Sequence, residues 1–300
     1  MPSPKSLTQL LVVLVLACQV ARASEAGLPR FIHLDEPTAD AGTQPAAQSR
    51  EINWHVQFEP KVRYVSPSGD LRIPGSGARA ETVDLADVNL NAPRLMPSFD
   101  LSLRRGDWRI NAIGLFYDID DQVARADSAF VLGDVAFAAG ERSSLSHSYA
   151  QLDFRLARTI IDSPIRPRSD AEGHRIRFRL DAEVGLRVYD FEFEYQNLDT
   201  GQRGSDDRTF FEPHAGVKAG FTIYEDVTID LYTNFGFWPT DAEAFSWDIG
   251  VGFQWRPVEY FGAQIGYRST IFRLNEGSGD REFEWEGSYQ GLYAGLQFRF

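Results

Sequence analysis

Cysteine is almost absent from the chain, since Cys18 is the only one among 300 residues. It lies in an N-terminal segment that we predict to be removed on export, so the mature chain would contain no thiol. This excludes a disulfide framework and thiolate chemistry. One alternative is left open, in which Cys18 becomes a lipidated N-terminus, although Leu16 two positions before it fits such a cleavage site poorly.

A long apolar run is also missing at the N-terminus. The run from Leu10 to Ala17 is far shorter than the roughly 20 residues that a membrane-spanning helix needs. It follows the basic Lys5 and precedes the small-residue site Ala21-Arg22-Ala23. These are the three parts of a secretory signal peptide. We therefore predict a signal peptide over residues 1–23, cleaved between Ala23 and Ser24.

Basic residues are scarce, with 30 Lys and Arg against 43 Asp and Glu and a formal net charge of −13. Residues 1–23 contain Lys5 and Arg22 and no acid, so their removal makes the charge two units more negative. Such a chain is a poor nucleic-acid binder, because neutralising phosphates takes a surplus of Lys and Arg. The surplus acid indicates a solvated, repulsive loop surface; a platform for divalent cations at lipopolysaccharide is the alternative.

Helical periodicity is absent after the signal segment. Residues 24–50 show no periodicity at all and predict a disordered tail, because they cannot bury enough apolar area to offset ordering. From residue 51 onward, apolar and polar residues alternate repeatedly, as in Val227-Thr228-Ile229-Asp230-Leu231. Alternation at period two is typical of strands with one apolar face. We predict an all-β domain over residues 51–300.

The alternating segments number about ten, with eight or twelve left open, and most reach the nine to eleven or so residues of a tilted membrane strand. They cover residues 52–58, 99–103, 108–119, 150–156, 176–188, 213–223, 227–237, 245–255, 261–271 and 292–300. In 108–119 the apolar parity slips near Ala112-Ile113, which predicts a bulge. Short connections alternate with long ones, namely 66–97, 120–146, 190–208 and 275–287. This predicts a single antiparallel up-and-down transmembrane barrel.

A soluble sandwich would alternate too, but the polar face here favours a membrane barrel. Trp54, Trp108, Trp247 and Trp255 lie on the apolar face, as expected for aromatic girdles at the membrane interfaces. The polar face carries charges of both signs, which predict an ion-pair network in a narrow lumen. Its members are Asp153, Arg155, Arg177, Arg179, Asp181, Glu183, Arg187, Glu212, His214, Lys218, Asp230, Asp248 and Arg268.

The C-terminal pattern Leu292, Ala294, Leu296, Phe298, Phe300 resembles the signal by which outer-membrane barrels are handed to the barrel-assembly machinery. Leu296, Phe298 and Phe300 are its expected core. Together with Val83-Asp84-Leu85 and Gly114-Leu115-Phe116-Tyr117, the pattern is similar to small Gram-negative outer-membrane barrels of the OmpW and OmpA type. The resemblance implies an outer-membrane location and a barrel fold, surrounded by outer-membrane lipids and lipopolysaccharide. It implies no catalytic residues.

Weak candidates for catalysis lie on the rim. Asp118, Asp120 and Asp121 end one strand and His147 begins the next, so a carboxylate could orient the imidazole as a general base. Omptin proteases use acid and His groups on such a rim, but their motifs are not reproduced here. Ser148 beside His147 is similar to the pair of lipid A deacylases, yet adjacent residues point to opposite faces of a strand.

The five His residues are scattered, which argues against a metal centre, and no cofactor motif is present. The sequence therefore favours a non-enzymatic outer-membrane barrel with a mostly plugged lumen and a structural, surface or ligand-interaction role. A narrow pore or a conduit for small apolar ligands is the second reading, since about ten strands enclose little more than their own side chains. A rim hydrolase is the third.

Overall fold

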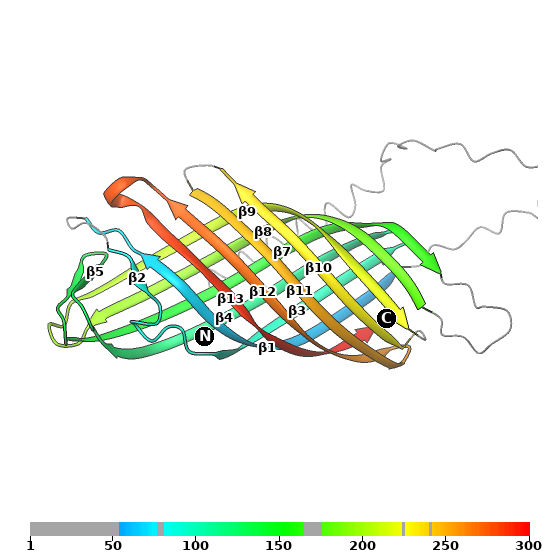
Figure 1. Ribbon diagram of the computed structural model, residues 1–300, viewed down its shortest axis with the longest axis horizontal. Helices are drawn as coiled ribbons and strands as arrows, with labels where there is room; N and C mark the ends of the chain where they lie inside the picture. The colour runs from blue at the N-terminus through cyan, green and yellow to red at the C-terminus, as the bar shows by residue number, and fades with distance from the viewer. Residues whose placement is uncertain (1–53, 77–80, 165–175, 224–225, 240–241) are drawn as a thin grey trace, which may run out of the picture. The chain divides into compact units, whose positions relative to one another are not determined.

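A computed structural model describes residues 54–76, 81–164, 176–223, 226–239 and 242–300 (Figure 1). The predicted signal peptide, the cleavage site at Ala23 and Ser24, Cys18 and the predicted tail lie outside the described residues. The boundaries of those segments therefore stay predictions.

Ten long strands form one closed antiparallel barrel, which confirms the predicted fold. In the described residues each strand pairs with its neighbour in the chain, and β13 pairs with β1 to close the ring (Figure 1). The strands are β1 (His55–Arg72), β3 (Arg94–Arg105), β4 (Trp108–Arg125), β7 (Arg142–Pro164), β8 (Ile176–Asn197), β9 (Arg203–Ile223), β10 (Val227–Trp238), β11 (Ala242–Val258), β12 (Phe261–Glu276) and β13 (Phe283–Arg299). No helix among the described residues has the length and apolar character to cross a membrane.

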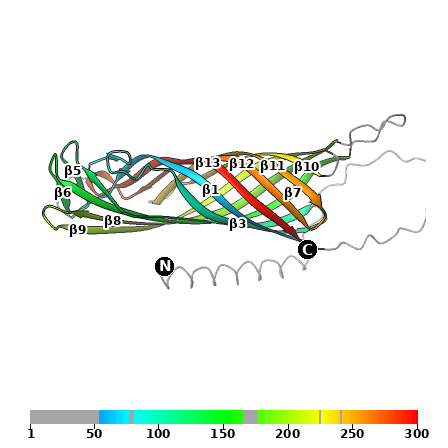
Figure 2. The ribbon, with the colours of Figure 1, turned by 90° about the horizontal axis from the view of Figure 1, so that it is seen from below.

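The two ends of the barrel differ in their connections. At the short-turn end, Gly106-Asp107 joins β3 to β4 and Glu259-Tyr260 joins β11 to β12. The backbones of Val56 and Phe300 exchange two hydrogen bonds there, of 3.1 and 2.9 Å. At the long-loop end, β2 (Val83–Asp84) adds to β1, and β5 (Phe130–Leu132) pairs with β6 (Val135–Phe137) in a hairpin (Figure 2). The short 3₁₀ helix η1 (Gly279–Arg281) lies between β12 and β13.

The strands are longer at the long-loop end than the sequence pattern predicted. The expected long loop over 190–208 is wrong, because β8 and β9 stay paired as far as Gln196 and Arg203. The remaining turn is fastened to β7, since the backbone N–H and guanidinium of Arg142 both donate to the Asp199 carboxylate, at 2.8 to 3.0 Å. Those hydrogen bonds lower the pKa of Asp199, and the one from the backbone N–H of Arg142 has the largest effect.

Along several strands the inward face changes from charged to apolar. On β8 the inward residues toward the short-turn end are Asp181, Glu183 and Arg187, and those toward the long-loop end are Tyr189, Phe191, Phe193 and Tyr195, at most 5 % exposed. The outward face changes in the opposite sense, from Val184 and Leu186 to the exposed Glu192 and Glu194. On β8, apolar residues therefore face outward toward the short turns and inward toward the long loops.

This change explains a wrong prediction in β4. The register of β4 with both neighbours is continuous through Ala112-Ile113, so the expected bulge is absent there. The apolar parity slips because the lumen itself turns apolar, from Asn111 to Leu115 and Tyr117. The register of β4 with β7 shifts instead between Ile119 and Gln122, where Asp121 adopts a φ of 44°.

Candidate functional site in the barrel lumen

A layer of buried charges crosses the middle of the lumen. It contains three arginines, four carboxylates and one imidazole, drawn from five strands, and every member is at most 6 % exposed. The members are Asp153 and Arg155 of β7, Glu183 and Arg187 of β8, Glu212 and His214 of β9, Asp248 of β11 and Arg268 of β12. Each strand contributes side chains from alternate positions, so adjacent strands bring opposite charges to the same height.

Arg187 is the centre of this layer and is fully buried. Its guanidinium lies 3.3 Å from Asp153, 3.3 Å from Glu212 and 3.5 Å from Asp248. It also donates to the Ser246 hydroxyl at 2.7 Å. Three carboxylates from three strands thus share one cation, which an arginine can serve because its planar group presents five donors.

The remaining members link this centre to the barrel wall. Arg155 pairs with Asp153 at 2.6 Å and with Glu183 at 3.3 Å, and Arg268 donates to Asp248 at 2.7 Å. Nε2 of His214 lies 2.9 Å from Asp153. Such buried groups are tolerated only when each is paired and hydrogen-bonded, so the layer is a continuous network across the lumen.

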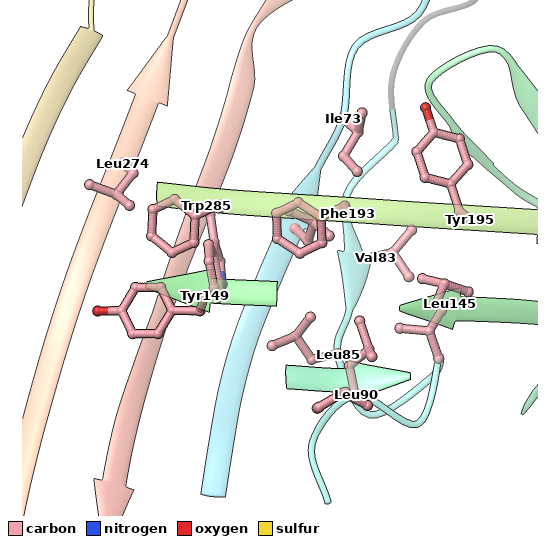
Figure 3. Packing of buried hydrophobic residues seen from close by; sticks show 14 of the residues in the cluster. Ile73, Val83, Leu85, Leu90, Leu145, Tyr149, Phe193, Tyr195, Leu274 and Trp285 are labelled. Carbon is pink, nitrogen blue, oxygen red and sulfur yellow. The ribbon is translucent and has the colours of Figure 1, made fainter. Parts of the chain in front are cut away.

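Above this layer, toward the long-loop end, the lumen is filled by aromatic and aliphatic side chains (Figure 3). Trp285 is fully buried and its ring centroid lies 4.6 Å from that of Phe191, 4.8 Å from Phe272 and 5.0 Å from His147. Aliphatic residues outside the barrel strands, among them Val83, Leu85 and Leu90, close the cluster (Figure 3). This end of the lumen is therefore a packed hydrophobic core.

Below the charged layer, toward the short-turn end, lies a cavity of about 510 Å³. It reaches from Arg155 and Arg268 to Glu259, Tyr260 and Phe300 at the end of the barrel. Among the described residues, eleven Lys and Arg but six Asp and Glu line it. A chain with 43 acids and 30 basic residues thus places more than a third of its basic side chains around one cavity.

The structure places all thirteen residues of the predicted lumen network on the inward face. Ten are buried, and they comprise the eight of the central layer with Asp181 and Asp230. Lys218 lies 3.2 Å from Asp230, and Arg179 donates to Asp181 at 2.8 Å. Arg177 is exposed near the short-turn end, where it donates to Asp162 at 2.6 Å. Their role in closing the lumen stays a proposal.

Several lumen residues were missed by the sequence reasoning. Glu59, Lys61 and Arg63 of β1 face inward, and the Lys61 ammonium pairs with Glu59 at 2.7 Å and with Asp100. Arg109 of β4 lies 3.0 Å from Asp181 and also contacts Glu183. For the β1 residues the signal was present, because they alternate with the outward Phe58 and Val62, but the expected first strand ended at Phe58. Arg109 lies within the expected strand 108–119 and was not singled out.

The weak catalytic candidates are not brought together. His147 faces the lumen, is 2 % exposed, and its Nε2 lies 3.0 Å from the hydroxyl of Tyr289. Asp118 and Asp120 are exposed, and Asp118 accepts a hydrogen bond from Ser148 at 2.8 Å. The exposed Asp121 sits at the bulge, where its backbone N–H donates to Ser146. The imidazole and the carboxylates are therefore separated by the barrel wall.

The C-terminal residues lie as the alternation predicted. Leu296 points outward and is 44 % exposed, while Gln297 points inward and is 1 % exposed. The ring of Phe298 packs edge-on against Phe261 of β12, with centroids 5.8 Å apart. Phe300 is 76 % exposed beside the seam between β13 and β1. Whether these residues act as an assembly signal stays a prediction.

No protein-family model and no curated protein sequence matches the chain. Among solved structures, the outer membrane protease OmpT from Escherichia coli is similar over 84 % of this chain and 99 % of its own, with a TM-score of 0.50 and 9 % identity. Neisserial surface protein A matches over 82 % and 97 % with a TM-score of 0.31 and 12 % identity. The Pseudomonas putida toluene transporter TodX matches over 81 % and 89 %, with a TM-score of 0.27 and 10 % identity.

The match with OmpT shows a shared barrel fold and nothing finer, since the sequences are so different. The TM-scores of 0.31 and 0.27 are too low to show a shared architecture. The predicted resemblance to barrels of the OmpW and OmpA type therefore stays a prediction.

Proposed function

We propose that the chain is a Gram-negative outer-membrane protein whose barrel spans the bilayer, with the short turns in the periplasm and the long loops outside. The outward side chains support this. Val217, Leu231, Ile249 and Ile265 lie on four neighbouring strands and are 43 to 60 % exposed. A continuous apolar surface of this kind is rare on a soluble monomer. A closed barrel also satisfies its backbone hydrogen bonds internally, as the bilayer requires.

The role that the lumen supports best is non-enzymatic and non-conducting, with the long-loop end presented at the cell surface for a structural or ligand-interaction role. One observation carries this proposal. Two different fillings close the lumen in succession, the ion-pair layer around Arg187 and the aromatic core around Trp285. A hydrated ion would have to separate buried ion pairs and then cross an apolar core, and both steps are unfavourable.

Planar-bilayer conductance tests this closure. We expect the purified barrel to give no steady openings, because the charged layer and the aromatic core both obstruct the lumen. Folding of the same sample would be checked by the heat-dependent shift in gel mobility, and a general porin would serve as the positive control for insertion. Large, long-lived openings of uniform size would refute the closed lumen and favour the narrow pore.

Deleting Phe300 should impair assembly in cells. The deletion removes the two backbone hydrogen bonds with Val56 at the barrel seam, each worth about 1 kcal/mol, and the terminal aromatic as well. We expect the folded form in the outer-membrane fraction to fall sharply, while Phe300→Tyr keeps both features and assembles normally. Refolding of the purified deletion variant into vesicles, where the assembly machinery is absent, separates the loss of the seam hydrogen bonds from the loss of an assembly signal. A similar defect without cellular machinery would mean that the residue matters for barrel closure alone.

A further inference from the structure

The cavity at the short-turn end contains cations that the barrel itself does not neutralise. In the described residues, four of its arginines have no carboxylate within ion-pair distance, namely Arg63, Arg104, Arg256 and Arg299. The Nε atoms of Arg63 and Arg256 are also buried without a hydrogen-bond partner among those residues. A guanidinium that is partly removed from water and lacks a counter-charge is unfavourable unless an anion joins it.

Three of the four lie together at the mouth of the cavity. Arg299 is on β13, at the closing seam, and it lies within electrostatic range of Arg256 on β11 and Arg104 on β3. Acidic groups within the same range, Glu59 near Arg299 and Asp230 near Arg256, form their ion pairs with Lys61 and Lys218 instead. Glu259 lines the same cavity, yet it forms no ion pair with these arginines in the described part of the chain.

Neutral acceptors hold all three guanidinium groups in place. Arg299 donates through Nε to the Gln57 amide oxygen at 3.0 Å, and Arg256 donates to the Thr228 hydroxyl at 2.9 Å. Arg104 donates through Nε to the Gly106 carbonyl oxygen at 3.1 Å. Each group is thus oriented through one of its nitrogens without losing its charge. Guanidinium groups that are already oriented favour bidentate binding of an oxyanion, because little further ordering is needed.

We propose that the mouth of this cavity binds a small phosphate-bearing anion of at least two negative charges, which enters from the short-turn end. Arg104, Arg256 and Arg299 supply the positive charge, in a chain whose formal net charge is −13. The cavity of about 510 Å³ is within the usual size range of small-ligand pockets. The site lies below the charged layer, so its occupation does not depend on whether the lumen conducts.

Calorimetric titration of the detergent-solubilised barrel with inorganic pyrophosphate tests the site. We expect one pyrophosphate per barrel, with an affinity that falls as salt is added. The double variant Arg256→Gln, Arg299→Gln should bind at least about tenfold more weakly, because each charge-assisted contact to phosphate is strong. Arg273→Gln is the matched control, since Arg273 is exposed at the long-loop end and pairs with Glu284. Absence of binding, or equal binding by all three proteins, would overturn the proposal.

A second measurement needs no variant. Phenylglyoxal modifies accessible arginines, and peptide mass analysis reports the rate at each position. Pyrophosphate should slow modification of Arg104, Arg256 and Arg299 and leave Arg273 unchanged; identical rates with and without pyrophosphate would refute the site. A parallel titration with a short-chain phosphatidic acid identifies the source of the phosphate. Tighter binding than pyrophosphate indicates a lipid headgroup, and weaker binding indicates a soluble phosphate compound.

Discussion

Replacing Arg187 by Met should destabilise the barrel by about 3–5 kcal/mol, the usual result of removing one partner from a buried ion pair. The methionine fills a similar volume, so most of the effect is electrostatic. Three carboxylates lose their shared cation, but two of them keep another, because Asp153 still contacts Arg155 and Asp248 still contacts Arg268. Equilibrium unfolding in urea of the barrel refolded into lipid vesicles would measure the loss.

Glu212 is the carboxylate left without a cation. Among the described residues, Arg187 is the only Lys or Arg within ion-pair distance of Glu212, and the other contacts of Glu212 are the hydroxyls of Ser246 and Tyr189, at 2.6 and 3.2 Å. We therefore expect the double variant Arg187→Met, Glu212→Gln to recover much of the lost stability, since the amide removes the unpaired buried charge.

The double variant Arg187→Met, Glu183→Gln is the matched control. Glu183 belongs to the same layer, but it pairs with Arg109 and Arg155 and not with Arg187. This double variant should recover no stability, because Glu183 keeps its ion pairs with Arg109 and Arg155 when Arg187 is replaced. Equal recovery by the two double variants would show that total lumen charge, and not the Arg187–Glu212 pair, decides stability. A single Arg187→Met variant as stable as the wild type would show that the layer contributes nothing.

The parity of the strands could be predicted from the sequence, and the lumen filling only in part. Alternation correctly separated the two faces of β10 and β11, so Ile229 and Ile249 point outward while Asp230 and Asp248 point inward. Parity alone does not say which face is inward, because exchanging the faces leaves the alternation unchanged. We expected the apolar face to point outward throughout, which holds along β10 and β11 but not in the part of β8 toward the long loops.

The inward orientation of the aromatic residues toward the long-loop end could not be predicted from any single strand. On β8 the aromatic residues from Tyr189 to Tyr195 alternate with acids, and in the preceding part of the strand charged residues alternate just as regularly with aliphatic ones. The charged residues point inward in the preceding part, yet the aromatic residues point inward in this one. What decides this is the contact with other strands and with loop residues such as Leu85 and Leu90, which no local pattern contains. The same limit explains the rim candidates. His147 pairs with Ile119, and Asp118 with Ser148, so the residues that were expected to meet lie on opposite faces.

Truncating Trp285 to Ala should destabilise the barrel by about 3–5 kcal/mol, the usual effect of removing a large buried aromatic side chain. Trp285 contacts rings from three other strands, with Phe191 and Phe193 on β8, Phe272 on β12 and His147 on β7 between 4.6 and 5.4 Å away. These rings are attached to a closed barrel, so they cannot collapse fully into the space that the indole leaves.

Substitution by Phe separates packing from hydrogen bonding. The indole N–H of Trp285 is buried and has no hydrogen-bond partner among the described residues, so Trp285→Phe removes no hydrogen bond while it keeps one aromatic ring in the core. We expect this variant to retain most of the stability that Trp285→Ala loses, by the same unfolding measurement. Trp54→Ala is the surface control, because Trp54 is half exposed and the ring contact that it makes among the described residues is with Arg105, worth about 0.5–1 kcal/mol. Equal losses for Trp285→Ala and Trp54→Ala would mean that the aromatic filling does not contribute to the stability of the barrel, and closure would then rest on the charged layer alone.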